Sequence, residues 1–548
     1  MTAELSADAV VVGTGAGGAA VAAELAAGGL DVVVLEEGAR HDHRTFTARP
    51  RDMTLRLYRD AGQLATIGTP PIVLPLGRAV GGTTLVNSGT CFRTPGRVLE
   101  RWAREDSIAP LSDELFAHVE EVIGVAEVPE ALAGRNALLV KRGAEALGLS
   151  GGFLRRNAPG CRGSGVCAFG CPTGAKQHAA ASWLPRAEAA GARVVAGVEV
   201  RRVLVRQGRA VGVHARGLTV RAPIIVVACG ALLTPGLLRR SGVRSPALGR
   251  HLTIHPASAA RARFDEPIDP WDGVPQSYYV DALADDGILL EGIAGPPDQA
   301  ALATPGSGAL HRERMLAARS TASFGVMVAD HATGSVREVG GRLLVRYDLH
   351  PDDAERLRRG FALLADIWWA AGAREILVPL AGVPALRRGD SGPLLRARVR
   401  PRDVKAMAFH PLGTARAGAD PARAVVDPDL QVHDVRGLYV ADGSAVPSSP
   451  QAHGQGHDRH LRVDLRRGGH RRGLYVADGA AVPSGWKAIA LTSRGRTCAR
   501  ASGPLSPPRR AGSPASGTRI SRAPTAHQMS ASSSKPRRRR SASSECRS

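Results

Sequence analysis

Three glycines near the start of the chain have the spacing that a phosphate-binding turn requires. Gly13, Gly15 and Gly18 follow the apolar run Ala9–Val12, and residues 19–27 have a helix-forming composition. In a strand–turn–helix unit the first glycine permits the tight turn and the second lets the backbone approach a pyrophosphate, while the third lets helix and strand pack closely. The N–H groups at the start of the helix then face the phosphates. The pattern predicts a dinucleotide-binding site.

An acidic residue ends the next apolar run, which covers residues 30–35. Glu36 follows that run and lies 18 residues after Gly18. A carboxylate at the end of a second buried strand accepts hydrogen bonds from ribose hydroxyls and disfavours a phosphate on that ribose. The expected ligand is therefore FAD or NAD rather than NADP. The alternative is an α/β turn that holds no ligand.

Residues 77–90 read Gly-Arg-Ala-Val-Gly-Gly-Thr-Thr-Leu-Val-Asn-Ser-Gly-Thr and are crowded with small side chains. Such a loop lets a flat ring system lie against the backbone, which favours a flavin. At this segment the chain resembles the glucose–methanol–choline (GMC) oxidoreductase family of FAD enzymes. The second signature of that family resembles residues 228–242, and its C-terminal block resembles residues 404–449. The resemblance covers roughly residues 8–450 and includes the glycine turn.

The resemblance implies an α/β fold with two kinds of domain. A three-layer, Rossmann-like FAD-binding domain is joined to an antiparallel-sheet substrate domain of the α+β type. Composition, rather than the resemblance, predicts a disordered C-terminal tail. The implied ranges are 1–256 for the first part of the FAD-binding domain with its cysteine loop 157–178, 257–400 for the substrate domain, 401–452 for the closing segment, and 453–548 for an aberrant basic tail.

The resemblance also implies which residues bind FAD. They are Gly13, Gly15, Gly18 and Glu36 at the ADP half, Gly81, Gly82, Thr83 and Asn87 along the pyrophosphate and flavin, Val200 at the adenine, Gly230 in the second signature, and Asp442 and Gly443 beside the ribityl chain. For Val200 an ordinary buried strand residue is the alternative.

His410 begins the segment His-Pro-Leu-Gly-Thr-Ala-Arg. In the family a histidine at this position accepts the alcohol proton while hydride leaves the same carbon for the flavin. Imidazole suits this role because its unperturbed pKa, roughly 6.5, lets it act as a base near neutral pH. His453 lies eleven residues beyond Asp442, where the family has the second member of the catalytic pair. The resemblance thus implies oxidation of a small-molecule alcohol to an aldehyde or ketone, with oxygen or a carrier as the final acceptor; a structural histidine is the alternative for His410.

After residue 450 the sequence departs from the family, which continues with Asn/His-Pro and a helix that caps the flavin. Residues 454–460 read Gly-Gln-Gly-His-Asp-Arg-His instead. We hypothesise a one-base shift of the reading frame near residues 451–456, since one set of codons for residues 456–460, read one base later, gives Val-Thr-Ile-Ala-Thr. This segment is similar to the missing helix. The alternative function is therefore a catalytically impaired flavoprotein remnant.

A near-repeat lies beyond this point. Residues 473–479 read Gly-Leu-Tyr-Val-Ala-Asp-Gly and match residues 437–443. A single frame shift does not copy a segment in frame, so the hypothesis needs a local duplication as well. Sequencing of the gene together with detection of native tail peptides tests both.

Three cysteines, Cys161, Cys167 and Cys171, have the spacing C-x5-C-x3-C-P on a glycine-rich loop. Thiolates followed by proline are typical of iron–sulfur ligation. The loop resembles the iron–sulfur loop of bacterial FAD glucose dehydrogenases and also cysteine-rich loops of long-chain and sterol-type alcohol oxidases. A structural thiol loop over the substrate entrance is favoured, and an iron–sulfur cluster is the first alternative. Zinc is the second, although no fourth ligand stands at suitable spacing.

The net charge of +22 is concentrated in the tail. Residues after 450 contain 20 Lys and Arg against 4 Asp and Glu, which leaves +6 for the first 450 residues. This distribution disfavours a nucleic-acid-binding face. A chain of 548 residues with 44% apolar content predicts two or more folded domains. The absence of an 18-residue apolar run and of a basic leader predicts no membrane span, no signal peptide and a cytoplasmic location.

Overall fold

The computed structural model describes residues 3–387 and 389–450, together with the backbone of residues 474–477 and 480–483. Its centre is a parallel sheet with the strand order β20-β11-β2-β3-β7. The strands are β2 (Ala9–Val12), β3 (Val32–Glu36), β7 (Arg193–Ala196), β11 (Ile224–Val227) and β20 (Leu438–Val440). Every neighbouring pair in this sheet runs in the same direction. The strand and helix predicted around the glycine turn are confirmed.

The apolar residues of β2 and β3 alternate between two cores. Ala9 and Val11 pack into the core that contains helix α1 (Ala16–Ala27), whereas Val10 and Val12 pack into the core on the opposite face. Strands that are buried on both faces read as continuous apolar runs, as these do. The sheet is therefore the middle of three layers.

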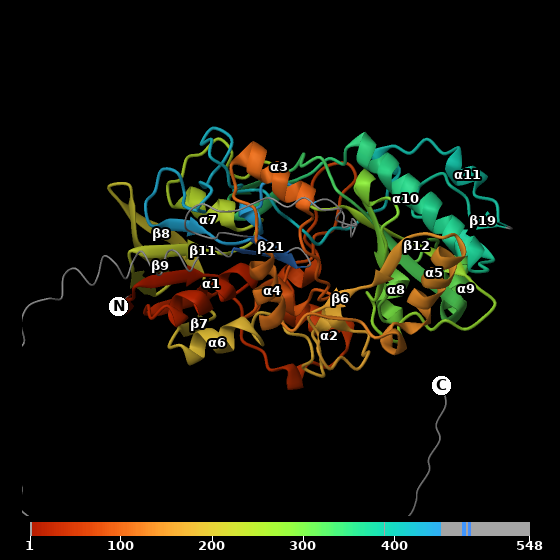
Figure 1. Cartoon of the computed structure of the whole chain (residues 1–548), viewed down its shortest axis with the longest axis horizontal. Helices are drawn as coiled ribbons and strands as arrows, with labels where there is room; N and C mark the ends of the chain where they lie inside the picture. Colours follow the sequence, from red (N-terminus) through yellow and green to blue (C-terminus); the bar gives the residue numbers. More distant parts are fainter. Residues whose placement is uncertain (1–2, 388, 451–473, 478–479, 484–548) are drawn as a thin grey trace, which may run out of the picture. The chain divides into compact units, whose positions relative to one another are not determined.

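A four-stranded sheet forms the layer opposite α1. It has the order β1-β10-β9-β8, and its strands are β1 (Ala3–Ser6), β8 (Val200–Arg206), β9 (Arg209–Ala215) and β10 (Leu218–Arg221). Helix α6 (Trp183–Ala189) lies against α1 on the other side (Figure 1). The predicted three-layer α/β arrangement is thus present.

The second large sheet is antiparallel throughout and has the order β19-β18-β12-β15-β14-β13-β5. Its strands are β5 (Gly151–Phe153), β12 (Ala257–Arg263), β13 (Tyr278–Val280), β14 (Ile288–Gly292), β15 (Thr321–Val328), β18 (Glu375–Leu377) and β19 (Leu386–Arg387). Helices α5 (Gly134–Ala146) and α10 (Pro351–Ala370) pack on it (Figure 1). The range 257–400 contains every strand of this sheet except β5.

The remaining elements connect or cover these layers. The helices are α2 (Pro50–Leu57), α3 (Gly96–Asp106), α4 (Asp113–Val122), α7 (Thr234–Arg240), α8 (Pro297–Ala303), α9 (Gly308–Leu316) and α11 (Gly392–Leu395). The strand pairs are β4 (Ala126–Glu127) with β6 (Arg155–Arg156), β16 (Ser335–Val339) with β17 (Arg342–Arg346), and β21 (Leu474–Ala477) with β22 (Ala480–Pro483). Within the described part of the chain, no helix combines the length and hydropathy needed to cross a bilayer.

Candidate nucleotide-binding and catalytic site

The fold has room for a side chain at only one of the three glycines of the turn. Gly13 has φ +101°, and a β-carbon there would overlap the carbonyl oxygen of Ala228. A β-carbon at Gly18 would overlap the carbonyl oxygen of Gly13. By contrast, no described atom lies within 4 Å of the β-carbon position of Gly15, the N-cap of α1. The fold itself therefore requires Gly13 and Gly18, whereas Gly15 leaves its face of the backbone open.

Glu36 is buried at the end of β3 and is held by protein donors. Its Oε2 accepts hydrogen bonds from the backbone N of Thr14 at 2.9 Å and from Thr14 Oγ1 at 2.6 Å, and its Oε1 accepts from Gly38 N at 2.8 Å. Burial raises the pKa of Glu36, and these hydrogen bonds act in the opposite direction. The carboxylate thus ties the end of β3 to the glycine turn. Thr14 was not among the predicted site residues. Its one sequence signal is a hydroxyl side chain between two glycines of the turn.

The loop of residues 77–90 lies directly against this turn. Gly81 N donates to Thr14 Oγ1 at 2.8 Å, and a β-carbon at Gly82 would lie 3.0 Å from Gly15 Cα. Thr83, in the short helix η3 (Gly82–Leu85), accepts from Gly77 N at 3.2 Å. The two glycine-rich segments that the sequence singled out are therefore neighbours in space.

Asn87 and Lys176 link this loop to the cysteine loop. The ammonium group of Lys176 is buried and donates to the carbonyl oxygens of Leu85 at 2.8 Å, Asn87 at 2.6 Å and Cys167 at 2.9 Å. The side-chain oxygen of Asn87 is buried and has no hydrogen-bond partner among the described residues. Since a buried polar atom normally has a partner, this oxygen is suited to a bound group.

Asp442 joins the second signature to the C-terminal segment. Its Oδ2 accepts from Gly230 N at 2.8 Å and from Thr234 Oγ1 at 2.6 Å, and its Oδ1 accepts from Ser444 N at 2.7 Å. Burial raises the pKa of Asp442, while these hydrogen bonds lower it. Two predicted site residues more than 200 positions apart, Gly230 and Asp442, are thus in direct contact.

Two further predicted site residues, Val200 and Gly443, are fixed through their backbones. Val200 is buried at the start of β8 and pairs with Ala215, so its backbone belongs to the four-stranded sheet. The carbonyl oxygen of Gly443 accepts from Gly413 N at 3.0 Å, which places the segment after His410 beside the end of β20. His453 lies outside the described residues.

His410 is nearly buried and lies beside a second imidazole. Its ring centroid is 5.6 Å from that of His255, and the rings meet edge to face at 68°. Nε2 of His255 is hydrogen-bonded to Ser449 Oγ. The segment that carries His410 is fixed by Thr414, whose hydroxyl donates to the carbonyl oxygen of Ala231 at 2.5 Å. His255 belongs to no recognisable sequence motif, and only the fold brings it to His410.

A buried carboxylate holds the backbone at His255. Asp330 accepts hydrogen bonds from Ile254 N at 3.1 Å, His255 N at 3.3 Å, the hydroxyl of Thr253, and Tyr347 Oη at 2.8 Å. His255 itself has φ +49°, a strained value for a residue with a side chain. Burial raises the pKa of Asp330 despite these donors. The four hydrogen bonds keep the strained segment in place.

The three cysteines of the 157–178 loop are thiols with separate neighbours. The contacts are Cys161 Sγ with Gly163 N at 3.4 Å, Cys167 Sγ with Arg156 Nη2 at 3.2 Å, and Cys171 Sγ with Thr173 Oγ1 at 3.3 Å. Burial raises the pKa of Cys171, but hydrogen bonds from Thr173 and nearby backbone groups outweigh it and lower the pKa. These contacts test neither the structural thiol loop, which stays the prediction, nor the iron–sulfur cluster, which stays its alternative.

The lowered pKa of the buried His178 predicts that the folded protein loses stability in acid. Its pKa is lowered to about 3 by burial and by the charges of Lys176 and His43, and its Nδ1 has no partner among the described residues. Below the reference value of 6.5 the unfolded chain binds a proton that the folded chain does not. Stability therefore falls as the pH falls from 6.5 toward 3, by at most about 1.4 kcal/mol per pH unit.

His178→Gln should reduce this loss, because glutamine does not titrate. Urea unfolding of both proteins at pH 7 and pH 5 measures it, and the original chain should lose up to about 2 kcal/mol more than the variant. Equal losses of stability in the two proteins would show that His178 has the same pKa in the folded and the unfolded chain.

Comparison with known proteins places these features in one family. Two models described as GMC oxidoreductase match residues 54–257 and 333–457. An uncharacterized GMC-type oxidoreductase of Mycobacterium tuberculosis is 44% identical over 461 residues, which cover 82% of this chain and 73% of that protein. A long-chain-alcohol oxidase of Arabidopsis thaliana is 30% identical over 81% of this chain and 64% of its own length. The crystal structure of a pyridoxine 4-oxidase from Mesorbium loti has the same fold, with a TM-score of 0.64, 21% identity, and coverage of 81% of this chain and 95% of that one.

Proposed function

The chain belongs to the GMC oxidoreductase family, and we propose that it is an FAD-dependent enzyme that oxidises the CH–OH group of an alcohol to an aldehyde or ketone. The observation that carries the proposal is the position of His410. This imidazole is nearly buried beside His255, on a segment that runs along the Asp442 strand end. A base in that position adjoins the residues proposed to hold the cofactor.

The residues of the nucleotide site fit FAD. The open face of Gly15 and its close approach to Gly82 leave a path of bare backbone for a pyrophosphate. The buried, unpartnered oxygen of Asn87 offers an acceptor to a polar hydrogen of the cofactor. Glu36 would face the adenosine ribose from the end of β3, and Asp442 would order the backbone near the ribityl chain.

Alcohol oxidation requires removal of a proton from oxygen and a hydride from carbon. Bound FAD would supply the hydride acceptor. His410 would accept the hydroxyl proton as the carbon–oxygen double bond forms, and its near burial keeps bulk water from competing for that proton. His255, fixed by Ser449 and by Asp330, would limit the rotation of the His410 ring.

The names of several relatives support a substrate class. Four proteins of Arabidopsis thaliana at 28–30% identity are named long-chain-alcohol oxidases. We therefore infer a long-chain alcohol, and a panel of straight-chain alcohols of increasing length is the appropriate first set. His453 is proposed as the second member of the catalytic pair on the family pattern alone.

Anaerobic spectroscopy of the full chain tests the function. The purified protein should show the visible bands of bound flavin, and these bands should bleach when a suitable alcohol of the panel is added. Bound flavin that no alcohol bleaches would favour the impaired remnant that the sequence after residue 450 suggests. Colourless protein that takes up no added FAD would contradict the cofactor assignment as well.

A further inference from the structure

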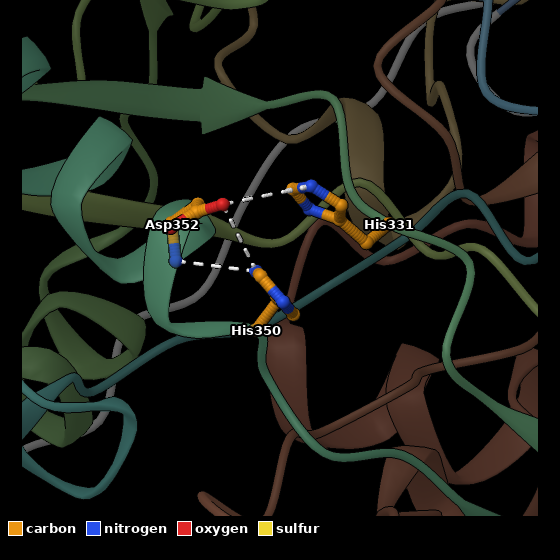
Figure 2. Close-up of side chains that lie close together, drawn as sticks. All are labelled: His331, His350 and Asp352. Atoms are coloured by element: carbon orange, nitrogen blue, oxygen red, sulfur yellow. Dashed lines mark hydrogen bonds and ion pairs between the residues drawn. The ribbon is translucent and has the colours of Figure 1, made fainter.

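Three potential metal ligands meet at the N-terminus of α10. A nitrogen of His331, a nitrogen of His350 and a carboxylate oxygen of Asp352 lie within 4.8 Å of one another. In Figure 2, dashed lines join the carboxylate of Asp352 to both imidazoles. The side chains of His331, His350 and Asp352 are 36%, 39% and 69% exposed, so that an ion could reach them from solvent.

A buried carboxylate fixes the orientation of His331. Nδ1 of His331 lies 2.8 Å from Asp353 Oδ1, and the backbone N of His331 donates to Asp353 Oδ2 at 3.2 Å. Asp353 has 0% side-chain exposure and is also paired with Arg356 at 3.0 Å. Because a carboxylate accepts the hydrogen bond, the proton of neutral His331 lies on Nδ1 and the lone pair lies on Nε2. That Nε2 atom is 4.0 Å from Asp352 Oδ2.

The opposite tautomer is set at His350. Its Nδ1 accepts a hydrogen bond from the backbone N of Asp352 at 3.3 Å, as the N-cap of α10. The lone pair of His350 is therefore on Nδ1, which lies 3.5 Å from Asp352 Oδ2. The two rings are stacked, with centroids 4.1 Å apart and planes inclined by 28°. Both lone pairs thus lie on the side of the Asp352 carboxylate.

We propose that His331 Nε2, His350 Nδ1 and Asp352 bind a divalent transition-metal cation, with zinc as the best fit. Two imidazoles, one carboxylate and a water would complete a tetrahedral shell. Bonds of about 2.0–2.1 Å place neighbouring ligand atoms roughly 3.4 Å apart in that shell, close to the 3.5 and 4.0 Å that separate the two imidazole nitrogens from Asp352 Oδ2. Because the rings are stacked, they would rotate on binding so that the ion lies in the plane of both. The ion would replace the long hydrogen bond from Asp352 N to His350.

The surroundings favour this class of ion over Ca²⁺ or Mg²⁺. Those cations select oxygen ligands, whereas two of the three atoms here are imidazole nitrogens. The carboxylate–histidine contact between Asp353 and His331 is the arrangement that supports metal-bound imidazole in many proteins. Arg356 balances the charge of Asp353, which leaves Asp352 to balance the cation.

Zinc titration of the full chain, in competition with a chromophoric chelator after removal of bound metal, tests the proposal. One site should be lost, or weakened at least about tenfold, in His331→Ala, His350→Asn and Asp352→Asn. Asparagine at residue 350 retains an N-cap acceptor for α10 and so separates ligand loss from helix loss. His311→Ala on α9 removes an imidazole outside the cluster and should bind zinc like the original chain.

Cobalt(II) distinguishes this site from the cysteine loop. A difference spectrum without a thiolate-to-metal charge-transfer band is expected, since the ligands are nitrogen and oxygen. Equal zinc affinity in the original chain and in folded His331→Ala would overturn the proposal. A cobalt spectrum dominated by thiolate bands would overturn it too, because it would assign the metal to Cys161, Cys167 or Cys171.

Discussion

Replacing His410 by alanine should slow the reduction of bound FAD by an alcohol about 10²- to 10⁴-fold, the range typical for loss of a general base. The imidazole is nearly buried and is held beside His255, so water cannot readily take its place. Anaerobic stopped-flow absorbance of the flavin measures the rate directly. Because His410 is proposed to act on the substrate proton, FAD content should be unchanged.

The control for this experiment is His311→Ala, which removes a histidine of α9 and should leave the rate unaltered. Equal flavin content and equal melting temperature establish that both variants are folded. Reduction of His410→Ala at the original rate would exclude this residue as the base. In that case another group, with His453 the first candidate, would have to accept the proton.

Replacing Gly15 by alanine should weaken FAD binding by about 10- to 100-fold without destabilising the FAD-free protein. Gly15 has φ −61° and ψ −173°, which alanine adopts without strain, and no described atom lies within 4 Å of its β-carbon position. In the proposed complex, however, the added methyl group enters the path of the pyrophosphate. Overpacking of this kind costs about 1–3 kcal/mol. Titration of FAD-free protein with FAD, followed by flavin fluorescence, measures the affinity.

Gly18→Ala is the matched comparison, and it should destabilise the protein itself rather than interfere with the bound cofactor. A β-carbon there would overlap the carbonyl oxygen of Gly13 and lie 3.0 Å from the β-carbon of Ala228. The clash is internal to the fold, so the expected result is a lower melting temperature even without FAD. If Gly15→Ala bound FAD as tightly as the original chain, the pyrophosphate would not pass this turn.

Local patterns predicted the glycine turn and its flanking elements well. The run Ala9–Val12 is β2, and the predicted helix-forming residues 19–27 lie within α1 (Ala16–Ala27). Gly13 and Gly18 were recognisable because the positive φ of the first and the close backbone approach at the second restrict the residue type to glycine. The Leu-Tyr-Val segment forms a strand in both copies, but the first copy pairs with β11 and the second with β22. Strand formation was therefore readable locally, whereas the strand partner was not.

The sequence did not reveal which side chains contact residues that are distant along the chain. Lys176 is of a residue type normally found at the surface, yet it is buried and bonds three carbonyl oxygens of two loops. Likewise, nothing near His255 in the sequence indicates that Asp330 holds its backbone or that His410 lies beside it. Such contacts depend on how the two sheets meet, and a short sequence pattern carries no information about that.

The strand order of the parallel sheet has a consequence for biosynthesis. β2 begins at Ala9, but the edge strand β20 ends at Val440, and Asp442 must reach Gly230 to complete the turn after β11. At translation rates of about 5–20 residues per second, the ribosome needs roughly 10–45 s to progress from Val227, the end of β11, to Val440, the end of β20. During that interval the edge of β11 has no partner, and unpaired strand edges promote aggregation. Nascent chains of this protein should therefore depend on chaperones until the last strand emerges.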